Sequence, residues 1–210
     1  MNNKTDRRKL RTKKLLRQAL IELMEEKGLE KITVSDLANR ADINRGTFYL
    51  HYEDVHDFIE QQVHEFLNQL SELASKVQFT DLLLAAERDE PFPGLISIIE
   101  HWERNADFCK WLLGPKGDPS FVLRVKELMK QRLFIKLSGL EGTDSASELQ
   151  VPLEYLIAYV TSANVGVLQH WFHTGRIQTP TEIHFIMIRL ISKGWLSFSG
   201  VRHAIANLKG

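Results

Sequence analysis

The fold of this chain is decided by the stretch Thr33-Val-Ser-Asp-Leu-Ala-Asn-Arg-Ala-Asp-Ile-Asn-Arg-Gly-Thr-Phe-Tyr-Leu-His-Tyr52. Its spacing predicts two short helices joined by a tight turn, the second over residues 44–52. Thr33 and Asp36 stand three residues apart, so each side chain can bond a free backbone N–H of the other in a capping box that starts the first helix. Asn44 is expected to cap the second helix, because its side-chain oxygen can accept from a free N–H there.

The second of these helices carries two different faces. Phe48 and Tyr52 are four residues apart and therefore lie on one flank, which we expect to pack inward. Arg45, Gly46 and Tyr49 occupy the neighbouring arc and stay free to face a partner. An arginine at the start of a short helix, a glycine that permits close approach and nearby hydroxyl and imidazole groups suit the major groove of DNA. The segment therefore predicts a helix-turn-helix that binds double-stranded DNA.

Charge is distributed unevenly along the chain. Overall, 27 Lys and Arg residues balance 27 Asp and Glu residues. Residues 1–17 hold eight basic residues against Asp6 alone, and 8 − 1 gives +7. Residues 1–52 hold 12 basic and 7 acidic residues, which gives +5 and leaves 15 − 20, or −5, for the rest. A basic amino end on an acidic body is expected when that end meets phosphates, with a solvated, disordered tail as the alternative for residues 1–6.

Length and composition set the broad class of the protein. A chain of 210 residues can bury a real core in one or two domains. The single cysteine, Cys109, excludes an intramolecular disulfide framework and fits a reducing cytosol. The amino end is charged rather than apolar, and no stretch approaches the roughly 20 apolar residues of a membrane span. We therefore expect a soluble, cytoplasmic protein with no membrane partner.

Helical periodicity runs through almost every long segment, and no segment shows convincing strand alternation, so the sequence predicts an all-α protein of about nine helices. One helix is expected over about residues 8–27, ending at Gly28. A periodic run without Pro or Gly over about residues 54–77 predicts one long connecting helix. Residues 1–53 would then form a three-helix DNA-binding domain, and residues 54–210 a helical body for effector binding and dimerisation.

Beyond the long helix, the sequence predicts a short helix near residues 79–87 and then helices of about 20 residues each. The pattern contains no internal repeat and no low-complexity tract. Breaks between these helices are expected where Gly, Pro and polar residues gather, at residues 88–94, 114–119, 138–147 and 174–180.

The last two predicted helices, at about residues 148–173 and 181–199, have more apolar surface than one small body covers. The apolar arc of the last helix spans about 200°, roughly twice the stripe of an ordinary surface helix. Gly166 on the preceding helix is small enough for close helix approach. We therefore expect a homodimer, with the alternative that both helices are central in one monomer. The predicted interface residues are Leu156, Val160, Val167, Trp171, Ile183, Met187, Leu190, Ile191 and Trp195.

The decisive stretch resembles the amino-terminal signature of the TetR family of bacterial transcriptional regulators, and the resemblance covers about residues 8–68. Its most specific parts are Gly46-Thr-Phe-Tyr49 and Tyr49-x-His-Tyr52. The rest of the chain is similar to the family in architecture. Residues 166–179 are similar to a carboxy-terminal subtype that often accompanies this amino-terminal module.

The resemblance implies roles for individual positions in the helix-turn-helix. Base edges or the groove floor would be approached by Arg45, Gly46 and Tyr49. The phosphate backbone would be followed by Thr47, Leu50 and His51. Val55 stands where the family commonly has a Lys, so the usual charge for a phosphate contact is missing at that point. The predicted DNA-binding set is Thr33, Ser35, Asn44, Arg45, Gly46, Thr47, Tyr49, Leu50 and His51.

The resemblance also implies an effector cavity among the middle helices. The residues expected to border it are His101, Trp102, Phe108, Trp111 and Phe121, with a packed core as the alternative. The sequence contains no catalytic constellation, so the protein is not expected to be an enzyme, and we expect no cofactor and no metal. His170 and His173 have i, i+3 spacing that could bring two metal ligands together, but no third ligand is indicated.

Taken together, these features predict a dimeric, DNA-binding transcriptional regulator. Repression is the most common action in the family, and two recognition helices related by a twofold axis require a near-palindromic operator. Binding of an unknown effector would release the protein from its operator. In the leading interpretation the effector is a small molecule, and in the alternative the body binds a protein co-regulator.

Overall fold

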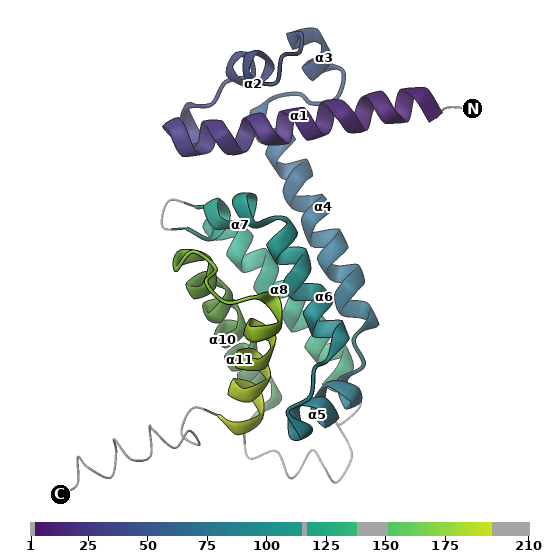
Figure 1. Cartoon of the computed structure of the whole chain (residues 1–210), viewed down its shortest axis with the longest axis vertical. Helices are drawn as coiled ribbons and strands as arrows, with labels where there is room; N and C mark the ends of the chain where they lie inside the picture. The colour runs from purple at the N-terminus through teal and green to yellow at the C-terminus, as the bar shows by residue number, and fades with distance from the viewer. Residues whose placement is uncertain (1–2, 115–116, 138–150, 195–210) are drawn as a thin grey trace, which may run out of the picture. The chain divides into compact units, whose positions relative to one another are not determined.

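The computed structural model describes residues 3–114, 117–137 and 151–194. Over these residues the chain has ten α-helices and no strand, which confirms the all-α prediction (Figure 1). Among the described helices, none combines the length and the hydropathy that a membrane span requires. A short 3-10 helix, Leu29–Lys31, follows the first helix. The α-helices are α1 (Asn3–Lys27), α2 (Val34–Arg40), α3 (Arg45–Tyr49), α4 (Val55–Lys76), α5 (Phe79–Arg88), α6 (Pro93–Arg104), α7 (Ala106–Leu113), α8 (Pro119–Leu137), α10 (Leu153–His173) and α11 (Pro180–Lys193).

The chain divides into two compact units inside α4, between Phe66 and Leu67. The domain boundary expected at residue 53 lies ahead of this helix, whereas the packing division lies within it, because Phe58 of α4 packs against aromatic rings of the first unit. The amino-terminal unit therefore contains α1, α2, α3 and the first part of α4. Its core is apolar, and its fully covered side chains include Leu16, Leu20, Leu37, Phe48, Phe58 and Val63.

Local sequence explains the ends of the first helices. Gly28 follows α1 with a φ of 75°, a backbone conformation that glycine adopts without steric cost, and its N–H donates to the Met24 carbonyl oxygen at 3.1 Å. α4 runs unbroken from Val55 to Lys76, which confirms the long connecting helix. The short α5 after it is confirmed as well.

The structure corrects two of the predicted helices. The segment between residues 94 and 114, expected to be a single helix, breaks at Asn105 into α6 and α7. The Asn105 side-chain amide donates to the His101 carbonyl oxygen at 2.7 Å, and asparagine side chains compete in this way with the backbone bonds of a helix. α3 ends at Tyr49 rather than at residue 52, because the His51 N–H turns to the Phe48 carbonyl oxygen at 2.9 Å. The break expected at residues 138–147 lies outside the described residues.

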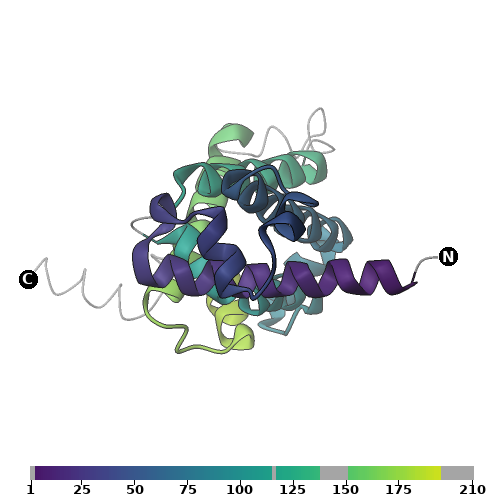
Figure 2. The ribbon, with the colours of Figure 1, turned by 90° about the horizontal axis from the view of Figure 1, so that it is seen from above.

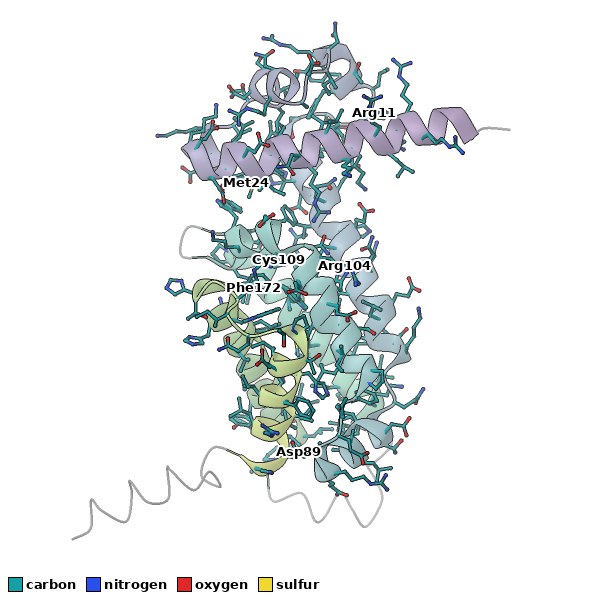
Figure 3. All side chains as sticks on the ribbon, viewed as in Figure 1. Arg11, Met24, Asp89, Arg104, Cys109 and Phe172 are labelled. Atoms are coloured by element: carbon teal, nitrogen blue, oxygen red, sulfur yellow. The ribbon has the colours of Figure 1, made fainter. Side chains whose placement is uncertain are left out.

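In the carboxy-terminal unit, α10 packs against α7 and α8, and α11 packs against α5 and α6. Aromatic rings meet at its centre, where the Trp102 ring centroid lies 6.1 Å from that of Phe121 and 6.2 Å from that of Phe172. Phe172 is labelled on α10 in Figure 3. The buried Trp171 donates its indole N–H to the Gln178 carbonyl oxygen at 2.9 Å, which ties the end of α10 to the loop before α11.

His184 on α11 is a buried hydrogen-bond acceptor. Its side chain is 0% exposed, and its Nε2 accepts from the Phe92 backbone N–H at 3.0 Å. An imidazole that accepts at Nε2 carries its proton on Nδ1, so the ring is neutral. Burial lowers the pKa of His184, and the nearby Asp89 opposes this shift without reversing it. Asp89, labelled in Figure 3, is itself held by Arg189 through two bonds of 2.8 and 2.7 Å.

Acidification is expected to destabilise the carboxy-terminal unit through His184. The unfolded chain takes up a proton at the ordinary histidine pKa of about 6.5, whereas the folded chain resists protonation until the pH is lower. The stability that the neutral ring contributes is therefore present above about pH 6.5 and is lost as the pH falls toward the folded pKa. One proton sets a maximum slope of about 1.4 kcal/mol per pH unit.

Urea denaturation of the wild type and of a His184→Gln variant at pH 7.5 and 5.5 measures this contribution. The glutamine oxygen can accept from the Phe92 N–H but does not titrate between these values, so it is the matched control. The wild type should lose more free energy of unfolding on acidification than the variant. Equal losses would contradict a role for His184.

Candidate nucleic-acid interface

The predicted capping box at the start of α2 is present. The Thr33 backbone N–H donates to an Asp36 carboxylate oxygen at 2.8 Å, and the Asp36 N–H donates to the Thr33 hydroxyl oxygen at 3.2 Å. Lys27 at the end of α1 adds an ion pair to the same carboxylate at 2.6 Å. The bonds from Lys27 and Thr33 hold the pKa of Asp36 well below its ordinary value. Asp36 therefore fixes the start of α2 to the end of α1.

A second ion-pair group fixes the other end of α2. Arg40 donates two bonds to the Glu26 carboxylate, at 2.9 and 2.7 Å, and one bond to Glu22 at 3.1 Å. The bonds from Arg40 lower the pKa of Glu26. The two glutamates stand 14 and 18 residues from Arg40, so no helical repeat in the sequence indicates the group. Only the packing of α2 on α1 brings these side chains together.

α3 is held by a cap at its start and by aromatic rings beneath it. The Asn44 side-chain oxygen accepts from the Gly46 N–H at 2.8 Å, which confirms the predicted N-cap. Phe48 is 0% exposed and Tyr52 is 7% exposed, which confirms the inward flank. The Phe48 ring centroid lies 5.4 Å from that of Tyr52 and 6.2 Å from that of Phe58, and the last two lie 4.7 Å apart. We call Phe48, Tyr52 and Phe58 the aromatic cluster.

The outward face of α3 carries large side chains that no described part of the chain covers. Tyr49 is 58% exposed and Leu50 is 78% exposed. Phe48, the residue directly before them, is fully buried. α2 and α3 lie on the same side of α1 (Figures 1 and 2). Among the residues expected to contact DNA, the exposed ones are Thr33, Asn44, Arg45, Gly46, Tyr49 and Leu50, and the half-buried ones are Ser35, Thr47 and His51.

Two residues of this predicted DNA-binding set also cap helices. The Thr33 hydroxyl and the Asn44 side-chain oxygen already cap α2 and α3. Gly46 avoids crowding the Asn44 cap, because a Cβ atom at this position would lie only 3.3 Å from the Asn44 side-chain oxygen. The exposed backbone at Gly46 can therefore approach a partner more closely than any other residue would permit.

Most of the residues expected to border an effector cavity are buried in this structure, and the Trp102 and Phe121 rings contact each other. His101, Trp102, Phe108 and Phe121 are each between 0 and 3% exposed, and Trp111 is half-buried. A cavity of about 570 Å³, open to solvent, lies instead between α8 and α10. Sequence reasoning missed this cavity because its charged lining residues have the pattern of a solvated helix face. The lining residues are Leu123, Arg124, Lys126, Glu127, Lys130, Glu154, Ala158, Thr161 and Ser162.

Three of the predicted interface residues belong instead to the core of the single chain, which corrects the prediction at these positions. Trp171, Ile183 and Met187 are 1, 3 and 5% exposed, so they have no surface left for a partner. Apolar periodicity does not distinguish a side chain buried in its own subunit from one buried against another. Of the remaining predicted residues, Leu156, Val160, Val167 and Leu190 are half-buried, Ile191 is exposed, and Trp195 lies outside the described residues.

α10 exposes a different row of side chains along one face. Tyr155 is 68% and Tyr159 is 59% exposed, and Ala163, Gly166 and His170 continue the same face at intervals of three and four residues. A Cβ atom at Gly166 would meet no other atom within 4 Å. We call these five residues the α10 stripe.

Comparison with known proteins identifies two regions of this chain. Residues 16–57 match the family described as bacterial regulatory proteins, tetR family, and residues 89–193 match a family described as transcriptional regulator C-terminal region. The uncharacterized HTH-type transcriptional regulator YxbF of Bacillus subtilis (strain 168) is 30% identical over 88 residues. These residues are 41% of this chain and 23% of YxbF, so the match spans less than a quarter of that relative's length.

Two solved structures share the fold over almost their whole length. A TetR transcriptional regulator from Streptococcus agalactiae 2603V has a TM-score of 0.60 and 24% identity, covering 89% of this chain and 97% of that one. A putative TetR-family transcriptional regulator from Syntrophomonas wolfei str. Goettingen has a TM-score of 0.63 and 16% identity, covering 90% and 98%. At these identities the likeness concerns the fold alone.

Two adjacent aromatic residues test how α3 is held. A Phe48→Ala variant should lose about 3–5 kcal/mol of unfolding free energy, because it removes a fully buried ring from the aromatic cluster. Its matched control is Tyr49→Ala, which removes a mostly exposed ring with one edge contact to Phe48 and should lose less than about 1.5 kcal/mol. Urea denaturation followed by circular dichroism measures both. Similar losses for the two variants would show that α3 does not depend on the cluster.

Proposed function

The chain belongs to the TetR family of bacterial regulatory proteins, and from that premise we propose that it is a dimeric repressor of a near-palindromic DNA operator, released by an effector. Membership of the family makes it a transcriptional regulator. The dimer, the repression, the operator and the effector are the substance of the proposal.

The observation that carries the proposal is the exposed face of α3. Arg45, Gly46 and Tyr49 are exposed, while Phe48 of the same short helix is buried in the aromatic cluster. Arginine can bond a guanine edge through two donors at once, and the glycine permits close approach to the groove floor. Thr47, Leu50 and His51 flank this face, and in the proposal they follow the phosphate backbone while Ser35 reaches it from α2.

Dimerisation is proposed through the carboxy-terminal helices. The α10 stripe offers exposed tyrosines at one end and small residues further along, so a second helix can approach closely at Ala163 and Gly166. Paired subunits would place two α3 helices in successive major grooves about 34 Å apart, which is why the operator should be a near-palindrome. Half-buried apolar side chains, such as Val160 and Val167, would complete the contact.

Effector control is proposed to act through α4, because this one unbroken helix contributes residues to both compact units. An effector shifts DNA binding only by the difference between its affinities for the two states of the protein. The cavity between α8 and α10 is an open space that could take a small molecule. A protein co-regulator bound to the body remains the alternative effector.

Arg45 is proposed to read a base, and its substitution tests that role. Selection from a random duplex pool would first define the operator. Arg45→Ala should then cost about 1–3 kcal/mol of discrimination at one symmetric base pair, because it removes a bidentate contact. Fluorescence anisotropy with single-base operator variants measures the loss.

The matched control for this experiment is Lys31→Ala, which removes one exposed positive charge from the same unit without touching α3. The control should keep the sequence preference of the wild type. An Arg45→Ala variant that loses the same affinity for every sequence would identify a phosphate contact instead of a base contact.

The α10 stripe is tested by Gly166→Arg. The position is open in the single subunit, and Arg has a higher helix propensity than Gly, so the variant should fold. Two arginines brought together at a close helix contact should convert the dimer into monomers at micromolar concentration. Analytical ultracentrifugation measures this, with the exposed Thr80→Arg on α5 as the control that stays dimeric. A Gly166→Arg variant that remains dimeric would exclude the stripe from the interface.

A further inference from the structure

The first turns of α1 carry positive charge and expose their side chains to solvent. α1 begins at Asn3, but the first buried side chain among its described residues is Thr12. The side chains of residues 7–11 are all exposed, and even Leu10 is 66% exposed. We call the five exposed cations of this stretch the α1 basic segment: Arg7, Arg8, Lys9, Arg11 and Lys14.

No described carboxylate neutralises these five cations. Lys13 lies in the same stretch but differs from these five cations, because it forms an ion pair with Glu65 on α4. Arg11 stands four residues from Arg7 and three from Lys14, and like charges at these spacings destabilise a helix. Cations in the first turns also oppose the positive end of the helix dipole. The segment therefore gains stability from an anion that binds from outside the chain.

The position of the segment indicates which anion this is. α1 and α3 belong to the same compact unit, and α1 continues past α3 toward the amino end in both views (Figures 1 and 2). Arg11 is labelled on α1 in Figure 3. Closer to α3 the charge is mixed, because Arg45 is accompanied by exposed Glu53 and Asp54 at the start of α4. A duplex seated on α3 would thus meet further positive charge along α1.

We infer that the α1 basic segment binds backbone phosphates of the duplex outside the base pairs that α3 reaches, an inference that rests on the proposed function. From Arg7 to Lys14 the helix rises about 11 Å at 1.5 Å per residue, comparable with about three phosphate spacings along one strand. Phosphate contacts carry no base information. The segment therefore strengthens binding to every DNA sequence by the same factor.

The test removes three charges of the segment in the full-length protein. An Arg7→Gln, Arg8→Gln, Arg11→Gln triple variant keeps polar side chains on an exposed part of α1, so its fold should be unchanged. The control is Arg88→Gln, Lys110→Gln, Lys136→Gln, which removes three exposed cations from the other unit. Anisotropy titrations from 50 to 200 mM salt, on the selected operator and on an unrelated duplex, give affinities and salt slopes.

The α1 triple variant should bind both duplexes at least about tenfold more weakly than the wild type at 50 mM salt. Its slope of log affinity against log salt should be shallower by about 2 to 5, because each neutralised phosphate contributes about 0.9 to the slope and a dimer has two such segments. The ratio of operator to unrelated affinity should stay at the wild-type value, and so should both slopes of the control.

Three results would overturn the inference in distinguishable ways. If the wild type selects an operator but the α1 variant matches it in affinity and slope, the segment is merely solvated and the proposed function stands. If the wild type selects no duplex at all, the proposed function fails and the inference fails with it. A variant that loses operator preference along with affinity would place the segment at the bases, which also contradicts phosphate binding.

Discussion

The packing of Phe48 against Tyr52 and Phe58 is the constraint on which the outward face of α3 depends. A helix of five residues is too short to be stable alone, because nucleation costs more than so few backbone bonds contribute. Burial of the Phe48 ring anchors it to α4 instead. Successive side chains of a helix point about 100° apart, so fixing Phe48 inward places Gly46 on the opposite, outward side and leaves Tyr49 beside the buried flank. One buried ring thus determines which side chains remain available to DNA.

Sequence reasoning performed best where the cause of a structure lies within a few residues. The capping box of Thr33 and Asp36 and the cap at Asn44 are local hydrogen bonds, and their residue types and spacing indicate them directly. The inward flank of α3 follows from the same short-range rule. The Arg40 group could not be predicted, since its partners on α1 come close only after α1 and α2 have packed.

In the carboxy-terminal unit, the sequence pattern predicts the helices but not the partners of their apolar side chains. Helical periodicity located α10 and α11, but it could not say which apolar side chains face the subunit's own core, and Trp171, Ile183 and Met187 turned out to be covered by their own chain. The exposed row on α10 begins with two tyrosines and continues with small residues, so hydrophobicity alone does not single it out. The break at Asn105 is equally hard to anticipate, because it depends on one side chain that bonds the backbone.

Charge is distributed unevenly between the helix-turn-helix end of the chain and the rest. The net charge of the whole chain is zero, yet residues 1–52 carry +5 and the remainder carries −5. A polyanion attracts residues 1–52 and repels the remainder of the chain, so this charge distribution favours an approach of DNA to the helix-turn-helix. Salt limits the range of this attraction, because attraction to phosphate falls off within about 10 Å at 0.1 M salt. In the proposed function, residence on one site then depends on short-range contacts at α3, the helix that the aromatic cluster holds in place.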